Sequence, residues 1–267
     1  MSALIEVEGV TKAFGGIVAN DGISLDVLEG RITGLIGPNG SGKTTLFNSI
    51  VGYHPIDSGS IRFEGKEISD LRVQQIARLG LLRTFQQTRI YGAMDCVKNM
   101  LISLPHRRET FRSMFQKHPA EVTEKAERLL NFVGLYQKRR LISGNLSFGQ
   151  QKLLEFAMAL MNEPKVLLLD EPTAGINPTL INGLIDRLKR AAAELGITLF
   201  VIEHNMPVIM GLADNIYCLP NGRLLAHGTP DATRGHPPVR DAYPRGPSET
   251  ANPAWPTPAP PAPLGAR

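Results

Sequence analysis

A glycine-rich run near residue 40 constrains this chain more than any other feature of its sequence. Residues 37–45 read Gly-Pro-Asn-Gly-Ser-Gly-Lys-Thr-Thr, which matches the pattern G-x-x-x-x-G-K-[ST]. An apolar run of strand length, 32–36, precedes it, and a helical pattern follows from Lys43. Glycines let successive backbone N–H groups point inward around an oxyanion, toward which the following helix directs its positive end. The run therefore predicts a phosphate-binding loop between a strand and a helix.

The residues of this loop are the predicted nucleotide ligands. Lys43 is expected to reach the β- and γ-phosphates, and the Thr44 hydroxyl to bind Mg²⁺. The other residues expected to contact the nucleotide are Gly37, Asn39, Gly40, Ser41, Gly42 and Thr45. A chance glycine-rich turn is the alternative, but the strand before and the helix after are the context that the motif requires. Nucleotide binding by itself does not say what its hydrolysis drives.

Two acidic residues follow a second apolar run. Residues 166–169 read Val-Leu-Leu-Leu, and Asp170 and Glu171 come directly after them. A parallel strand places its C-terminal end at the ligand crevice of an α/β sheet. Asp170 is expected to hold Mg²⁺ there, directly or through water, and Glu171 to polarise the attacking water. Acids after a strand often only begin a helix, but the phosphate loop upstream favours the catalytic interpretation.

The pattern along the chain predicts an α/β core interrupted by helices. Strand patterns disappear at about residue 88, and helical periodicity continues to about residue 160. Half of the 20 prolines lie in residues 236–267, which predicts an extended, disordered tail, with a Pro-rich docking motif as the alternative. The expected strands are 5–10, 23–27, 32–36, 61–63, 165–169 and 198–202, with helices at 43–51, 147–162 and 180–195.

Length and composition fit one large domain with a subdomain. The chain has 267 residues, 42% hydrophobic and 20% charged, and a net charge of +4. It has no basic stripe interleaved with aromatics, so we expect no nucleic-acid partner. Cys96 and Cys218 lack the spacing of a zinc site. Neither a run of about 18 apolar residues nor a signal peptide is present, so we expect a soluble, cytosolic protein unless another chain holds it at a membrane.

Several short motifs make residues 4–235 resemble an ATP-binding subunit of an ABC transporter. Residues 146–150, Leu-Ser-Phe-Gly-Gln, resemble the family signature LSGGQ and end 20 residues before Asp170. Residues 83–86 resemble the Q-loop, and His204 resembles the switch histidine. Phe14 resembles the aromatic residue that stacks on adenine. Each match is short, but their order and spacing together are specific to the family.

The resemblance implies a P-loop NTPase (RecA-like) fold: a mixed-sheet core with an ABC-type β-subdomain and an α-helical subdomain inserted at about 88–160. The implied cofactors are ATP and Mg²⁺. Gln86 and His204 would act in catalysis beside Glu171, and Gln86 would also bind the metal. The signature residues Ser147, Gly149 and Gln150 would meet the γ-phosphate held by the other protomer of a head-to-tail dimer. Two residues depart from the family pattern: Phe148 replaces a signature glycine, and Asn177 stands where many relatives have Asp.

Within the family, the chain most resembles the ATPases of branched-chain amino-acid importers. This resemblance rests on residues 83–87, 174–178, 202–206, 208–214 and 226–230. It implies two transmembrane permease subunits, a second ATPase chain that is the same or related, and a periplasmic solute-binding protein. The chain would then be peripheral on the cytoplasmic face of the inner membrane. A permease helix would dock near 88–99 through Arg89, Ile90, Tyr91 and Met94, although Ile90 and Met94 are equally consistent with core positions.

Other functions remain open at this point. A urea or short-chain amide importer would have a similar ATPase, and a lipopolysaccharide-type exporter is a weaker alternative. A soluble ABC ATPase of translation or DNA repair would carry two nucleotide domains or long coiled coils, whereas this chain has one phosphate loop and no sustained heptads. A phosphotransferase would not need the signature. The sequence leaves the transported solute, the role of the tail and the effects of Phe148 and Asn177 undetermined.

Overall fold

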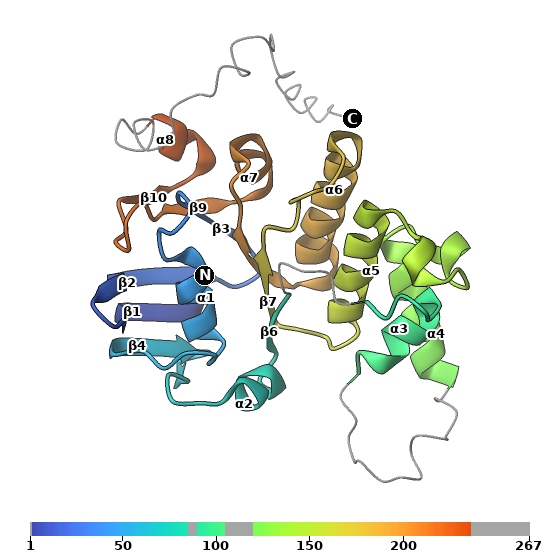
Figure 1. Ribbon diagram of the computed structural model, residues 1–267, viewed down its shortest axis with the longest axis horizontal. Helices are drawn as coiled ribbons and strands as arrows, with labels where there is room; N and C mark the ends of the chain where they lie inside the picture. Colours follow the sequence, from blue (N-terminus) through green and yellow to red (C-terminus); the bar gives the residue numbers. More distant parts are fainter. Residues whose placement is uncertain (1, 85–89, 105–119, 236–267) are drawn as a thin grey trace, which may run out of the picture.

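The structure, a computed structural model, describes residues 2–84, 90–104 and 120–235, and its strands form two sheets (Figure 1). One sheet is antiparallel, with the order β2-β1-β4-β5, and the other has the order β10-β9-β3-β8-β7-β6. In the second sheet all neighbours are parallel except β9 and β10. The strands are β1 (Ala3–Phe14), β2 (Ile17–Leu28), β3 (Ile32–Ile36), β4 (Ser58–Phe63), β5 (Lys66–Glu67), β6 (Leu81–Arg83), β7 (Val166–Asp170), β8 (Thr198–Ile202), β9 (Asn215–Cys218) and β10 (Ala226–Gly228).

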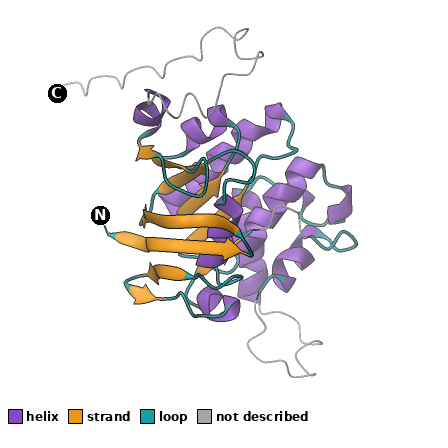
Figure 2. Ribbon diagram, turned by 60° about the vertical axis from the view of Figure 1, so that its left-hand side comes forward, coloured by secondary structure: helices purple, strands orange, loops and turns teal. Residues whose placement is uncertain are grey.

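Helices surround the six-stranded sheet, and three of them gather on the side of the molecule away from the antiparallel sheet (Figures 1 and 2). These three are α3, α4 and α5, which pack on one another. The helices are α1 (Lys43–Ile50), α2 (Val73–Arg78), α3 (Cys96–Ile102), α4 (Ala120–Phe132), α5 (Phe148–Leu160), α6 (Pro178–Leu195), α7 (Met206–Leu212) and α8 (Pro230–Gly235), with short 3-10 helices at Tyr136–Lys138 and Ser143–Asn145. None of the helices described is long and apolar enough to cross a membrane.

The six-stranded sheet separates two hydrophobic cores, which explains why its central strands are apolar throughout. Side chains alternate between the faces of a strand, and in β7 Leu167 and Leu169 face one core while Val166 and Leu168 face the other. The first core contains apolar residues of α3 to α7, and the second contains α1 and the antiparallel sheet. A strand buried on both faces reads as an uninterrupted apolar run, as expected for a parallel sheet covered on both sides.

Local signals in the sequence set the ends of the crossover helix α6. The Asn177 side chain caps the helix by accepting a hydrogen bond from Thr179 N at 3.1 Å, and Pro178 occupies the first turn. Gly196 ends the helix in the left-handed conformation, with φ of 68°. Its buried face includes Leu184 and Leu188. The helix thereby connects β7 to the parallel strand β8, and the two strands end side by side.

Each expected strand and helix has a counterpart in the structure, but the sequence pattern missed several short elements. Strands β5, β6, β9 and β10 have two to four residues, too few for a periodic signal. Strands β1 and β2 are longer than expected because register shifts interrupt their alternation of apolar and polar residues. The expected domain limits stay a prediction, and the expected disordered tail at 236–267 lies outside the described residues.

Candidate functional site

The predicted phosphate loop joins the end of β3 to the start of α1. The Lys43 side chain folds back over the loop, where its Nζ lies 2.8 Å from the carbonyl oxygens of both Gly37 and Pro38. Only 5% of the residue is exposed. Burial lowers the pKa of the Lys43 amine, and the nearby charges of Glu171 and Asp170 oppose that shift. The loop therefore holds a buried cation close to two carboxylates.

Two glycines of the loop have no room for a side chain. A Cβ on Gly37 would lie 2.1 Å from the Leu219 carbonyl oxygen, and one on Gly42 would lie 2.1 Å from the Ala19 carbonyl oxygen. Gly42 also has φ of 97°, which L-residues rarely adopt. Gly40 has φ of 79° but open space around it. The motif's spacing therefore reflects close backbone contacts as well as the turn.

Replacing Gly42 with Ala is expected to distort the loop, lower the melting temperature and weaken ATP binding at least tenfold. The new Cβ must displace the Ala19 carbonyl, and the positive φ adds about 1–3 kcal/mol of strain. Gly40→Ala is the matched control, because it shares the positive φ but meets no atom within 4 Å. Equal effects of the two substitutions on ATP affinity would show that strain alone, and not the contact with Ala19, matters.

Asp170 at the end of β7 is buried, with 1% of its surface exposed. Its Oδ2 accepts a hydrogen bond from Arg83 Nη2 at 2.5 Å, and Arg83 Nη1 also donates to Asn48 Oδ1 of α1. Burial raises the pKa of Asp170, and the Arg83 guanidinium opposes this rise. Within the part of the chain that the structure describes, the other oxygen, Oδ1, has no hydrogen-bond partner.

This orphaned carboxylate oxygen fits a magnesium ligand. Mg²⁺ prefers oxygen atoms and usually keeps several waters, needing only one or two protein ligands beside the phosphates. Asp170 and the exposed Thr44 hydroxyl can supply such ligands. In the described ranges, no group of three or more His, Cys, Asp and Glu side chains could hold a metal ion. The third expected ligand, Gln86, lies outside the described residues.

Glu171 and His204 meet at the same end of the sheet. Strands β7 and β8 are parallel, with Asp170 opposite Ile202, so the residues after them come together. His204 Nε2 and Glu171 Oε1 are 2.5 Å apart. Glu171 has φ of 50°, a conformation that costs about 1–3 kcal/mol for a residue other than glycine. The two adjacent carboxylates thus have different partners, His204 for Glu171 and Arg83 for Asp170.

The signature residues lie at the start of α5. Ser147 caps the helix, and a reciprocal pair of hydrogen bonds joins it to Gln150, at 3.4 Å and 3.2 Å. Phe148 is 46% exposed, and its ring lies close to Gly175. In the described part of the chain no hydrogen bond or ion pair joins Ser147, Gly149 or Gln150 to the phosphate loop. The structure therefore groups Lys43, Asp170, Glu171 and His204, and leaves the signature apart from them.

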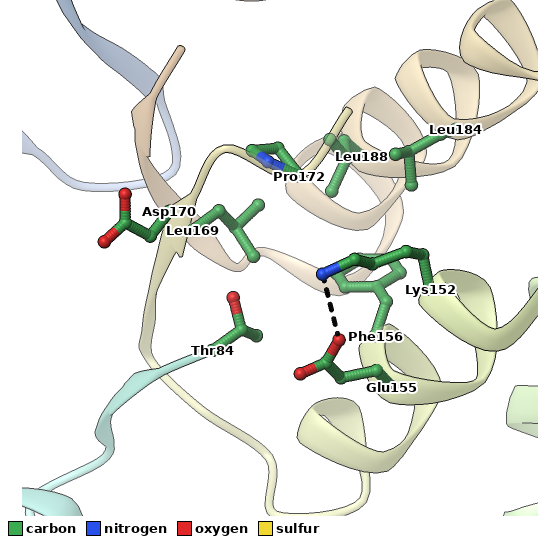
Figure 3. A pocket seen from close by; sticks show the side chains of 9 residues that line it. All are labelled: Thr84, Lys152, Glu155, Phe156, Leu169, Asp170, Pro172, Leu184 and Leu188. Carbon is green, nitrogen blue, oxygen red and sulfur yellow. Dashed lines mark ion pairs between the residues drawn. The ribbon is translucent and has the colours of Figure 1, made fainter. Parts of the chain in front are cut away.

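A small pocket lies beside the carboxylates, between β7, α5 and α6 (Figure 3). Lys152 and Glu155, which both belong to α5, form an ion pair in its lining, with Nζ 3.5 Å from Oε2. Figure 3 shows that Asp170 points away from this ion pair. Among the described residues that line the pocket, none belongs to the phosphate loop at 37–45.

Phe14, the expected adenine platform, lies at the end of β1 and is 45% exposed. Its ring stands at 81° to that of His54, with the centroids 5.3 Å apart. The Lys12 ammonium lies over the Phe14 ring, 5.4 Å from its centroid. An exposed aromatic face is consistent with stacking on a base.

Comparison with known protein families identifies the family of this chain. The family model described as "ABC transporter" matches residues 20–174, more than half of the chain. The chain belongs to the ABC transporter family. The resemblance inferred from the motifs is therefore confirmed.

The relatives cover almost the whole chain. The high-affinity branched-chain amino acid transport ATP-binding protein BraF of Pseudomonas aeruginosa is 38% identical over 247 residues, covering 90% of this chain and 97% of that protein. The protein LivG of Escherichia coli, with the same description, is 35% identical over the same shares of the two chains.

Solved structures agree with the expected fold class. The ADP conformation of MJ1267, an ATP-binding cassette of an ABC transporter, is similar with a TM-score of 0.82 and 33% identity, covering 91% of this chain and 99% of that chain. A nucleotide-free ATP-binding cassette from an ABC transporter is similar with a TM-score of 0.80, 33% identity and the same coverage. The α/β fold of an ABC-type P-loop ATPase is thereby confirmed.

Sequence reasoning missed the contribution of Arg83. It noted this residue only as part of the Q-loop motif, whereas the structure places its guanidinium on Asp170. The only signal for this pairing is that Arg83 ends a short apolar run, 81–82, and so lies at the same end of a parallel sheet as Asp170.

Proposed function

We propose that this chain is the ATP-binding and ATP-hydrolysing subunit of an ABC importer for branched-chain amino acids. The observation that carries hydrolysis is the meeting of the Lys43 loop, Asp170 and the Glu171–His204 pair at the ends of β3, β7 and β8. Relatives named as branched-chain amino-acid transport ATP-binding proteins, at 35–38% identity over 90% of the chain, support the solute class.

The residues of the loop bind and orient the triphosphate. The backbone N–H groups before α1 and the positive end of the helix favour anions, and the Lys43 ammonium adds a full charge. Phe14 offers its exposed ring to the adenine. When bound, Mg²⁺ would neutralise phosphate charge, with Asp170 and Thr44 as its protein ligands.

Glu171 takes the proton from the attacking water. Its carboxylate lies beyond the strand end, and His204 Nε2 holds one oxygen at 2.5 Å, which leaves the other to accept a proton. Phosphoryl transfer depends chiefly on positioning and electrostatic stabilisation, so the contact with His204 orients the base. Gln86 would also contact the water or the metal.

The signature completes the site of a second ATPase chain, identical or related. Ser147, Gly149 and Gln150 lie at the positive end of α5, which suits a phosphate, and within the described residues no hydrogen bond joins them to the chain's own phosphate loop. In a head-to-tail dimer they would contact the γ-phosphate on the partner. Hydrolysis would remove that bridging phosphate and let the dimer open.

The dimer would act on two transmembrane permease subunits, with a periplasmic solute-binding protein supplying the amino acid. This places the chain on the cytoplasmic face of the inner membrane as a peripheral subunit. Among the expected docking residues, Tyr91 is 53% exposed, whereas Ile90 packs on the helical core. Tyr91 is therefore the described side chain best placed to contact a permease helix, while Arg89 lies outside the described residues.

Uptake of labelled leucine, and separately of urea, tests this function in cells that lack the chain. Wild type is expected to restore leucine uptake and Glu171→Gln is not, because transport requires hydrolysis. If the wild-type chain restores urea uptake but does not change leucine uptake, the transported solute is an amide and not a branched-chain amino acid. If the chain restores uptake of neither solute, the importer assignment fails. The membrane protein that co-purifies with the chain would then indicate what the ATPase drives.

A further inference from the structure

The side chain of Glu203 lies buried between the two loops that carry the proposed catalytic pair. It follows β8 directly, and only 3% of the residue is exposed. Oε1 accepts hydrogen bonds from the backbone N–H of Thr173, at 3.0 Å, and from the Thr173 hydroxyl. Oε2 accepts from the backbone N–H groups of His204 and Asn205, at 3.0 Å and 3.3 Å. One carboxylate thus receives four donors from segments 30 residues apart in the chain.

These two segments are the ones that set the positions of Glu171 and His204. Thr173 lies two residues beyond Glu171, and His204 follows Glu203. The left-handed backbone of Glu171, with φ of 50°, persists only when surrounding contacts determine it. One such contact is Glu171 N to Ile202 O at 2.9 Å, and another is the hydrogen bond from Thr173 N, two residues on, to Glu203 Oε1 at 3.0 Å.

Only a carboxylate satisfies all four donors at this place. Both of its oxygens accept hydrogen bonds and neither donates, whereas an amide has one acceptor and one donor group. In a glutamine at 203, the NH₂ group would face other hydrogen-bond donors: either the two backbone N–H groups after β8 or the backbone N–H of Thr173. A buried N–H that loses its acceptor is unfavourable, so one of the two loops must move.

We propose that Glu203 is a positioning residue that holds Glu171 and His204 in their 2.5 Å contact. The inference rests on the proposed function, because it acts through the base assigned there. Among the described residues, the hydrogen-bond donors to the buried Glu203 carboxylate are Thr173, His204 and Asn205, and none of these lies in the phosphate loop. Its contribution is to fix the loop after β7 relative to the loop after β8.

Steady-state hydrolysis of MgATP by the full chain tests this role. Glu203→Gln is expected to lower kcat about 100-fold, the effect of displacing a catalytic group by about 1 Å, with KM for ATP changed less than threefold. Thr173→Val removes one of the four donors and is expected to lower kcat less, and Thr173→Ser, which keeps the hydroxyl, to restore most of that loss. Glu171→Gln/Glu203→Gln is expected to be no slower than Glu171→Gln alone, because Glu203 acts through Glu171.

Glu67→Gln is the matched control, since its carboxylate also accepts from a hydroxyl and from backbone N–H groups, but in the antiparallel sheet. It is expected to keep kcat. Wild-type kcat in Glu203→Gln, with Glu171→Gln inactive, would overturn the positioning role and leave the proposed function standing. If Glu203→Gln loses melting temperature, ATP affinity and kcat together, its role is structural and the positioning role is also overturned. If Glu203→Gln does not fold, full activity of Thr173→Val would overturn the positioning role instead. Activity in Glu171→Gln would instead remove the base on which the inference rests.

Discussion

Glu171→Gln is expected to lower ATP turnover about 1000-fold while leaving ATP affinity close to that of the wild type. A positioned general base contributes about 10²–10⁴-fold to a rate, and an amide cannot take the proton. Gln has the same length, and its carbonyl oxygen can still accept from His204 Nε2, the contact seen at 2.5 Å. The fold and the loop of Lys43 should therefore persist, with ATP held in a closed dimer.

Phosphate release under saturating MgATP measures the rate, and size-exclusion chromatography with ATP measures the dimer. Glu163→Gln is a close control, because Glu163 also has a positive φ, 48°, and contacts Lys125 in the helical region far from the loop. That variant should hydrolyse ATP at the wild-type rate. Turnover of Glu171→Gln within threefold of wild type would reject Glu171 as the base and direct attention to Gln86 and His204.

The sequence predicted the parts of this site that depend on short local patterns. The phosphate loop follows from nine consecutive residues, since its glycines are required by the turn and by contacts such as that of Gly42 with Ala19. Asp170 and Glu171 were found because a buried parallel strand is a continuous apolar run and its end faces the ligand. His204 could be placed in the same way, from the run 198–202 before it.

Contacts between distant segments could not be predicted from the sequence. The ion pair of Arg83 with Asp170 joins residues 87 positions apart, through a strand of only three residues that gives no periodic signal. The bonds of Glu203 to Thr173 likewise require the alignment of β7 with β8, which no local pattern specifies. A charged residue beside a strand end is a candidate ligand from sequence, but its partner is known only once strand order is known.

The same limit applies to the signature. A helix over 147–162 was expected, and α5 begins at Phe148 with Ser147 as its cap, but the sequence did not indicate what the Phe148 ring contacts. The ring lies against Gly175 in the loop that follows Glu171, where φ is 74° and a Cβ would lie 3.0 Å from the Phe148 ring. The Phe148 ring, at the position where the signature pattern LSGGQ has its first glycine, is thus accommodated beside a glycine elsewhere in the same chain.

Lys43→Ala is expected to weaken ATP binding at least 100-fold and to reduce turnover with it. A hydrogen bond that involves a charged group contributes about 1.5–3 kcal/mol, and the ammonium is expected to make more than one with the phosphates. The loop should keep its backbone path, because Gly37 and Gly42 remain, although the carbonyl oxygens of Gly37 and Pro38 lose the amine that lies 2.8 Å from each. The melting temperature should therefore change much less than the affinity.

Titration with a fluorescent ATP analogue, with and without Mg²⁺, measures the affinity. Lys125→Ala is the matched control, because its amine also donates to a backbone carbonyl, Met161 O at 2.8 Å, but from α4. If both lysine variants bind the analogue like the wild type, the loop does not bind phosphate through Lys43, and the nucleotide site must be sought elsewhere. If only Lys43→Ala loses binding while its melting temperature is kept, the buried amine acts on the nucleotide and not on the fold. That result would also explain why the chain maintains a desolvated lysine beside two carboxylates, an arrangement that a folding role alone would not require.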